Sequence, residues 1–195
     1  MKVINLTYLS TNYYLLQLND GWLMIDSGLP DTFSQLLQLL NQKGISVNEI
    51  NHLIVTHYHP DHAGLAQNLK DFGTNLIVHE CQLPFIKELN QSFKKNPKAY
   101  FKDIMPSNTT IVTGKDSRSF LKSIGIDGEI VTTPGHTDDS VTLILDDTCA
   151  FIGDLPPYSD TDDYDDYEIE DSWDMIKKCH VKTIYPGHGD SYKLY

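Results

Sequence analysis

The chain has 195 residues, of which 40% are hydrophobic and 22% charged, a balance that excludes disorder over the whole chain. Lys and Arg number 15 against 27 Asp and Glu, so the formal net charge is −12 at pH 7. A surface of this sign repels phosphate backbones at long range, so we expect no nucleic-acid partner.

The N-terminal segment 1–10 lacks the positive flank and long apolar core of a signal peptide, and no stretch has the apolar length of a membrane span. We expect a single domain over residues 1–195, located in the cytoplasm and without a membrane partner. Cys81, Cys149 and Cys179 form no Cys-x-x-Cys pair, which argues against a disulfide framework and a thiolate zinc site.

Short apolar runs separated by turn residues open the chain. Runs at residues 2–6, 13–18 and 22–25 predict an antiparallel meander, with Asn19-Asp20-Gly21 as a hairpin turn. Residues 31–43 carry leucines at helical spacing, so they predict a helix over this sheet, capped by Asp31 and followed by Gly44.

The middle of the chain alternates strand and helix, which predicts a mixed architecture of two or three layers. The expected elements are a strand at 53–56, a helix at 61–72, a strand at 76–79, a helix at 80–95 and a loop at 96–107. Further strands are expected at 110–113, 128–133, 141–145, 149–152 and 183–185, with a helix around Trp173 to Lys177 before the last one.

A cluster of metal-capable side chains follows the apolar run that ends at Val55. It reads His57-Tyr58-His59-Pro60-Asp61-His62. Imidazole and carboxylate groups suit zinc, iron or manganese, and residues two apart in an extended segment point to the same side. Asp61 alone could be an ordinary helix N-cap, but packing does not explain the whole cluster.

Three later segments repeat one pattern, in which an apolar strand ends in a tight turn that presents one potential ligand. They are Pro134-Gly135-His136, Ile152-Gly153-Asp154 and Pro186-Gly187-His188. Glycine permits the sharp turn, and strand ends at one sheet edge can converge on one site. Together with the first cluster they offer five histidines and two aspartates, enough for two ions.

In order and spacing, these segments and Asp26-Ser27-Gly28 resemble the metallo-β-lactamase superfamily, and the histidine motif looks similar to that of the glyoxalase II branch. The resemblance implies an α+β fold, a four-layer αββα sandwich. It implies that His57, His59 and His136 hold one ion, that Asp61, His62 and His188 hold a second, and that Asp154 bridges them. We expect zinc, with iron or manganese as alternatives.

Asp26 ends an apolar strand, and we expect it to accept a hydrogen bond from a ligand histidine, although an Asx-turn role is the alternative. His52, His79 and His180 match no ligand position of the family, so we expect them to be surface or core residues.

The resemblance implies a metal-dependent hydrolase of a small-molecule substrate. We expect hydroxide bridging the ions, oriented by Asp61 as the catalytic residue, to cleave a small ester, thioester or related substrate. An absent cysteine-ligand motif disfavours antibiotic hydrolysis, and Thr137-Asp138-Asp139-Ser140 departs from the glyoxalase II pattern. A mononuclear iron oxygenase of the persulfide dioxygenase type is the alternative, and a binding protein with a degenerate site is the weakest hypothesis.

The surface that selects the substrate is expected in the loops beside the metals, at residues 155–168 and 96–108. Tyr158, Tyr164 and Tyr167 could supply aromatic contacts there. The dense carboxylates between residues 160 and 166 predict a solvated loop, or else a surface that rejects polyanions or captures a cation. The oligomeric state cannot be read from the sequence.

Overall fold

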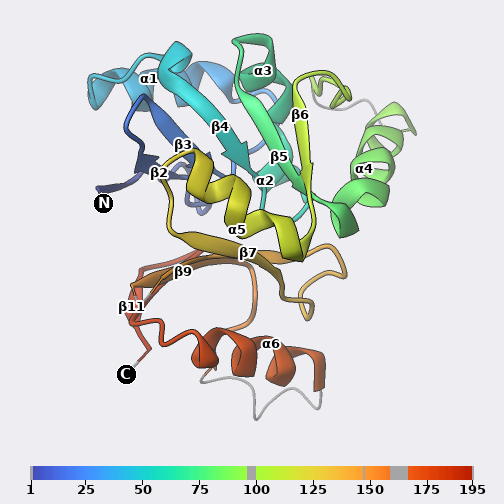
Figure 1. Ribbon diagram of the computed structural model, residues 1–195. Coiled ribbons are helices and arrows are strands. Elements are labelled where there is room, and N and C mark those ends of the chain that lie inside the picture. The colour runs from blue at the N-terminus through green and yellow to red at the C-terminus, as the bar shows by residue number, and fades with distance from the viewer. Residues whose placement is uncertain (1, 96–99, 147, 159–166, 195) are drawn as a thin grey trace.

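The computed structural model describes residues 2–95, 100–146, 148–158 and 167–194. Two β-sheets lie face to face in these ranges, with helices on the outer side of each sheet (Figure 1). One helix, α5 (Gly114–Ser123), instead lies between the two sheets at one side, where it contacts β6 and β7. The first sheet has the order β1-β2-β3-β4-β5-β6, and the second has the order β11-β10-β9-β8-β7. The four-layer αββα sandwich is therefore confirmed, and the two or three layers expected from strand and helix alternation alone were too few.

The strands of the first sheet are β1 (Val3–Asn5), β2 (Tyr14–Gln17), β3 (Trp22–Ile25), β4 (Ile50–Ile54), β5 (Asn75–His79) and β6 (Thr109–Val112). Those of the second sheet are β7 (Gly128–Thr132), β8 (Val141–Leu145), β9 (Cys149–Gly153), β10 (Thr183–Pro186) and β11 (Tyr192–Lys193). The helices are α1 (Phe33–Gln42), α2 (Pro60–Ala63), α3 (Ala66–Asp71), α4 (Leu83–Lys95), α5 (Gly114–Ser123) and α6 (Tyr167–Lys178).

Three apolar layers hold the sandwich together. One lies between the first sheet and the helices α1, α3 and α4, a second between the two sheets, and a third between the second sheet and α6. Side chains alternate between layers along each strand because a strand has a period of two. In β8, Leu143 and Leu145 face the first sheet, whereas Ile144 packs in the layer of α6.

The parallel strands of both sheets place their carboxyl ends at one edge of the molecule. Strands β3, β4, β5 and β6 run parallel, and β9 and β10 run parallel in the second sheet. A parallel connection needs a crossover, and helices supply it here. The residues directly after these strands therefore lie at the same edge. They include the first residues of the loops that lead to α2 and α6.

The predicted meander is confirmed, because β1, β2 and β3 pair antiparallel and Leu18 N–H donates to Gly21 O at the turn. The N-cap prediction was wrong: Thr32 precedes the first residue of α1, and Asp31 has a φ of 68° outside the helix. The strand predicted at 53–56 starts earlier, at Ile50, and ends at Ile54.

The helix predicted at 61–72 is divided into α2 and α3 at Gly64. A Cβ on Gly64 would lie 2.4 Å from the ring of Pro30, so the chain passes too close to Pro30 for a side chain. Helix α5 was not predicted, although Thr113 caps it by accepting the Asp116 N–H. Its first turn is polar, so the apolar repeat is visible only in its second half.

Across the described ranges, none of the helices combines the length and the hydrophobicity that crossing a lipid bilayer requires.

Candidate metal centre

All seven predicted ligands gather at the shared edge of the sandwich. In the described part of the chain they form three overlapping groups whose ligand atoms lie within 4.8 Å of one another. The first group is His57, His59 and His136, the second is Asp61, His62 and His188, and a third, made of His57, His62 and Asp154, shares one residue with each of the other two. The loop after β4, the turn after β7 and the ends of β9 and β10 supply them.

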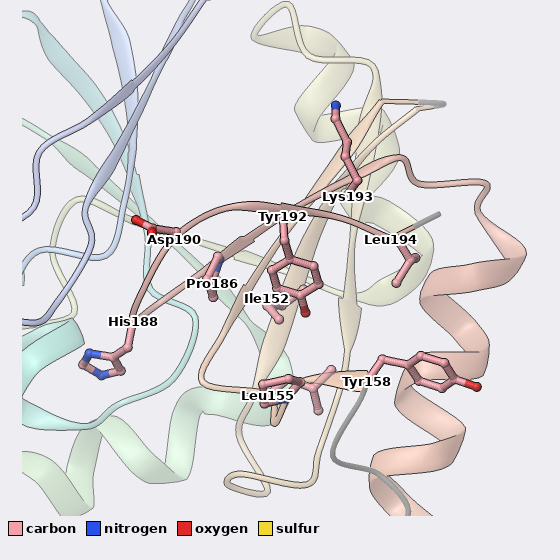
Figure 2. A pocket seen from close by; sticks show the side chains of 10 residues that line it. Ile152, Leu155, Tyr158, Pro186, His188, Asp190, Tyr192, Lys193 and Leu194 are labelled. Atoms are coloured by element: carbon pink, nitrogen blue, oxygen red, sulfur yellow. The ribbon is translucent and has the colours of Figure 1, made fainter.

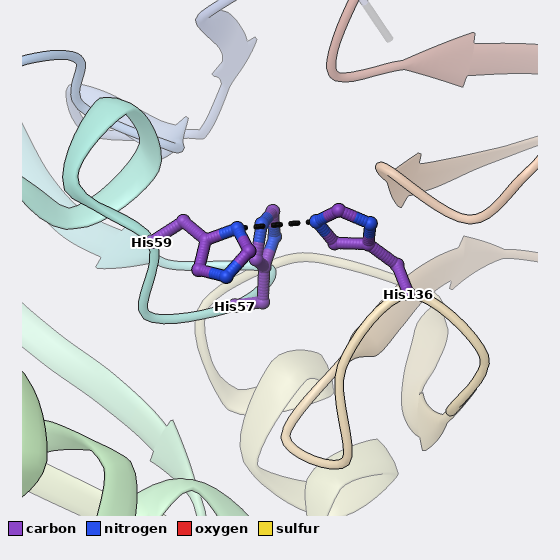
Figure 3. Close-up of side chains that lie close together, drawn as sticks. All are labelled: His57, His59 and His136. Carbon is purple, nitrogen blue, oxygen red and sulfur yellow. Dashed lines mark hydrogen bonds between the residues drawn. The ribbon is translucent and has the colours of Figure 1, made fainter.

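The first group brings three imidazole rings face to edge. His59 Nδ1 lies 3.1 Å from His136 Nε2, and the ring of His57 stands beside both (Figure 3). His57 is fully buried, whereas His59 and His136 are exposed. Because His57 is buried and His59 and His136 are exposed, the first group can be reached from solvent.

The second group lies next to the first, with the ring centroid of His62 4.2 Å from that of His57. Asp61 Oδ2 is 3.4 Å from His62 Nε2 and 3.3 Å from His188 Nε2. Thr11 Oγ1 donates to the same Asp61 oxygen at 3.1 Å. Helix α2 starts at Pro60 with His59 as its N-cap, so its first turn presents Asp61 and His62 to the site.

Asp154 lies between the two groups. Its Oδ1 is 3.3 Å from His62 Nε2, and its Oδ2 is 3.3 Å from His188 Nε2. The same Oδ2 is 3.6 Å from His136 Nε2 and 3.8 Å from His57 Nε2. One carboxylate is therefore within reach of histidines from both groups.

The Nδ1 atoms of three histidines make polar contacts outside the centre. Nδ1 of His57 contacts Thr56 Oγ1 at 3.2 Å, Nδ1 of His62 donates to Asp26 Oδ2 at 2.9 Å, and Nδ1 of His188 donates to Ser10 O at 2.7 Å. These contacts direct the three Nε2 atoms to the centre, which is how protein ligands are oriented toward metal ions.

The centre fits metal ions by the test of unsatisfied polar atoms. His57 Nε2, His62 Nε2 and Asp154 Oδ1 are buried and have no hydrogen-bond partner. Buried polar atoms are nearly always satisfied, and here three unsatisfied ones lie around one point. The donor set of imidazole and carboxylate groups is that of zinc, iron and manganese sites.

Electrostatics support the same interpretation. Burial, together with the nearby charge of His62, lowers the pKa of His57 well below its usual value, so its ring is neutral. Burial would also lower the pKa of His62, but Asp26, Asp154 and Asp61 raise it to about 12. Three carboxylates around one imidazole make a place that favours a cation.

Residues that the ligand prediction did not include hold the ligand loop in position. The buried Asp139 accepts the Tyr58 N–H through Oδ2 at 2.7 Å. Gln82 Nε2 donates to Val55 O at 2.9 Å and to Asp139 O at 3.2 Å. The departure at Asp139 from the glyoxalase II pattern was visible in the sequence, but Gln82 carried no signal.

Glycine is required where the β9 and β10 turns pack closely. A Cβ on Gly187 would lie 2.3 Å from Asp154 Oδ1 and 2.7 Å from His62 Cε1. Gly187 N–H also donates to Gly153 O at 2.6 Å, which joins the two turns. The glycines before His188 and Asp154 therefore permit the approach of the ligands as well as the turn.

Among the other residues singled out from the sequence, Asp26 contacts the centre and three histidines lie apart from it. Asp26 makes the expected hydrogen bond to His62 and also accepts the Thr56 N–H at 2.7 Å. His52, His79 and His180 lie outside the three metal-capable groups of the described residues. Tyr164 and the carboxylates Asp160, Asp162, Asp163, Asp165 and Asp166 lie outside the described ranges, whereas Tyr158 and Tyr167 are exposed.

A hollow of about 370 Å³ opens beside the centre, and His136, Asp154 and His188 line it. The layered fold and this cluster define a metal-binding αββα sandwich protein. The family model described as the metallo-beta-lactamase superfamily matches residues 6–188, and the chain belongs to that superfamily.

Curated relatives are named as metallo-hydrolases and lactamase-like proteins. The "Probable metallo-hydrolase MJ0888" of Methanocaldococcus jannaschii is 25% identical over 93% of this chain and 88% of its own length. "Beta-lactamase-like protein 2 homolog" of Drosophila melanogaster is 26% identical over 95% of this chain, which spans 60% of that relative. "Thioesterase pkgB" of Emericella nidulans is 28% identical over 93% of this chain and 46% of its own length.

Solved structures show the same fold. TTHA1623, crystallised in a di-iron-bound form, has a TM-score of 0.71 and 21% identity, and the match covers 100% of this chain and 95% of that one. The metallo-beta-lactamase family protein TTHA1429 of Thermus thermophilus has a TM-score of 0.75 and 18% identity over 98% of this chain and 74% of that one.

Proposed function

We propose that this protein is a dinuclear metal-dependent hydrolase of a small ester or thioester. The observation that carries the proposal is the convergence of His57 Nε2, His62 Nε2 and Asp154 Oδ1, three buried atoms without a hydrogen-bond partner. A site that only stabilised the fold would satisfy these atoms.

His57, His59 and His136 would hold one ion, and Asp61, His62 and His188 the other. Asp154 would bridge them, because its two oxygens lie 3.3 to 3.8 Å from histidines of both groups. The complete second group offers ligands for a second ion. A mononuclear iron oxygenase, which would use only part of the whole ligand set, is the alternative function.

When bound, the two ions would supply Lewis acidity and a shared hydroxide near neutral pH. The chain itself holds and orients the reacting groups. Asp61 Oδ2 is fixed by the Thr11 hydroxyl and faces His62 and His188, so it can orient the attacking water and accept its proton. No serine or cysteine nucleophile is needed.

Zinc is the proposed metal, since three histidines with carboxylates suit it. Iron is the first alternative, because TTHA1623 has the same fold and was crystallised with two iron ions. The name of the thioesterase relative supports thioesters as the substrate class. Since a net charge of −12 repels phosphate groups at long range, we propose a small-molecule substrate and no nucleic-acid or membrane partner.

The test is elemental analysis of protein purified without added metal or chelator, followed by assays with activated esters and thioesters. We expect about two zinc ions per chain and hydrolysis that a chelator abolishes. His59→Ala should lose metal and activity, and His52→Ala, which changes a histidine outside the three groups, should lose neither.

One iron per chain, together with oxygen consumption on a persulfide and no hydrolysis, would contradict the proposal and favour the oxygenase. Protein that shows neither hydrolysis after reconstitution with zinc nor oxygen consumption after reconstitution with iron would contradict both functions.

A further inference from the structure

A second hollow extends the site on the side of the second sheet that α6 covers. It encloses about 440 Å³ between the segment that follows β9 and the C-terminal strand β11. Leu155 and Tyr158 border it on one side and Tyr192 and Leu194 on the other, with His188 at its end (Figure 2). Its volume is in the range of small-molecule sites, which span about 300–1,000 Å³. We call this hollow the apolar cleft.

The apolar cleft is continuous with the candidate metal centre. Leu155, Pro157, Pro186 and His188 line both the cleft and the hollow that contains His136 and Asp154. A molecule whose reacting carbon lies beside Asp154 and His188 can therefore extend one arm into the cleft without leaving the protein surface.

The lining determines which arm fits. It is formed mainly by Ile152, Leu155, Pro157, Pro186, Tyr192 and Leu194. Lys193 lines the cleft but donates to Thr183 Oγ1 at 2.8 Å, and its side chain points away from Tyr192 and Leu194 (Figure 2). The ammonium of Lys177 lies over the ring of Tyr158, 3.3 Å from its centroid. The carboxylate of Asp190 also points away from Tyr192 and Leu155 (Figure 2). The chemistry of the cleft therefore suits an uncharged aliphatic or aromatic group.

We propose that the apolar cleft binds an uncharged alkyl or aryl arm of the substrate, so that this enzyme selects esters or thioesters with a medium-length apolar arm. This inference rests on the proposed function for the bond that is cleaved, but the cleft itself can be tested separately.

The kinetic test compares p-nitrophenyl acetate, butyrate, hexanoate and octanoate with zinc-loaded protein. We expect kcat/KM to rise by up to about fourfold for each methylene buried, and to level off when the cleft is full. Leu194→Asp should flatten this dependence while retaining acetate hydrolysis, and Leu194→Met should preserve it. Leu83→Asp introduces the same charge at a leucine that is 41% exposed on α4, and it should leave the dependence unchanged.

A binding test separates the cleft from the hydrolase function. Octanamide is uncharged, keeps the alkyl arm and lacks the ester, and its affinity for the zinc-loaded protein can be measured by ligand-observed NMR. We expect octanamide to bind and Leu194→Asp to weaken the binding at least tenfold, whereas Leu83→Asp should not.

Ester hydrolysis with a kcat/KM that does not change with chain length, together with octanamide binding that Leu194→Asp does not weaken, would contradict the role of the apolar cleft. The proposed hydrolase function would then remain. Absence of all hydrolysis, with octanamide binding that depends on Leu194, would overturn the hydrolase function and support the cleft.

Discussion

Asp26 and His62 form a buried pair in which Nδ1 of the imidazole donates to Oδ2 of the carboxylate at 2.9 Å. Asp26 directly follows strand β3, and His62 lies in helix α2. The pair therefore links the end of a strand of the first sheet to this helix. The contact fixes the tautomer of His62 and directs Nε2 toward Asp61 and Asp154.

Asp26→Asn should lower metal affinity about 10- to 100-fold, because the amide cannot stabilise the ring as the carboxylate does. Asn also tolerates the φ of 59° that Asp26 adopts. Competition with a chromophoric chelator measures the change. Asp146→Asn removes a surface contact with Arg118 and should leave metal affinity unchanged. Equal affinities for Asp26→Asn and wild type would contradict the role of the pair.

Asp139 holds the backbone between two ligand histidines. Asp139→Ala leaves the buried Tyr58 N–H without its acceptor, and we expect the free energy of unfolding to fall by about 1–3 kcal/mol. Metal affinity should fall too, since His57 and His59 flank that amide. Asp139→Asn keeps an oxygen at this position and should recover most of both losses. Urea unfolding and metal titration measure them, and an Asp139→Asn variant as weak as Asp139→Ala would argue against the hydrogen bond as the cause.

Gly187 leaves room for the carboxylate of Asp154. Gly187→Ala places a Cβ against Asp154 Oδ1 and His62 Cε1, so Asp154 must move and metal content should fall below half of the wild-type value. Gly114→Ala is the matched control, since its Cβ would meet only His79 Nε2 at 3.9 Å. Elemental analysis checks both variants. Full metal content in Gly187→Ala would show that Asp154 does not need this position.

Tyr14 should make the free energy of unfolding depend on pH in the alkaline range. Burial and, to a smaller extent, Asp26 raise the pKa of its hydroxyl, which donates to Pro186 O at 2.7 Å. The unfolded chain loses this proton above about pH 10 and the folded chain keeps it, so stability should fall as the pH rises past 10.

Tyr14→Phe should reduce that fall by at most about 1.4 kcal/mol per pH unit. Urea unfolding at pH 8, 9.5 and 11 measures the slope. Tyr100→Phe, at a tyrosine that is 67% exposed, should keep the wild-type slope. Identical slopes for Tyr14→Phe and wild type would contradict the linkage.

The candidate ligands could be predicted from the sequence because each one follows an apolar strand or a glycine turn. His57 to His62 are contiguous, and His136, Asp154 and His188 each come directly after a glycine. The apolar runs also predicted most strands, including β3 and β8 at their observed bounds. Helix α5 was not predicted because its first turn is polar.

The contacts that orient the ligands could not be predicted, because they join residues that are distant in the chain. Thr11 reaches Asp61 across 50 residues, and Asp139 reaches Tyr58 across 81. Neither residue type carries a periodic or motif signal at this separation.

The sequence by itself determined which metal-capable side chains follow the strands and turns, since these depend on local order and on the period of the apolar pattern. Only the tertiary structure decided which oxygen of Asp154 faces His62 and which faces His188, and that the apolar cleft opens beside His188. Those features depend on how the two sheets pack, which fixes distances between residues that no local pattern relates.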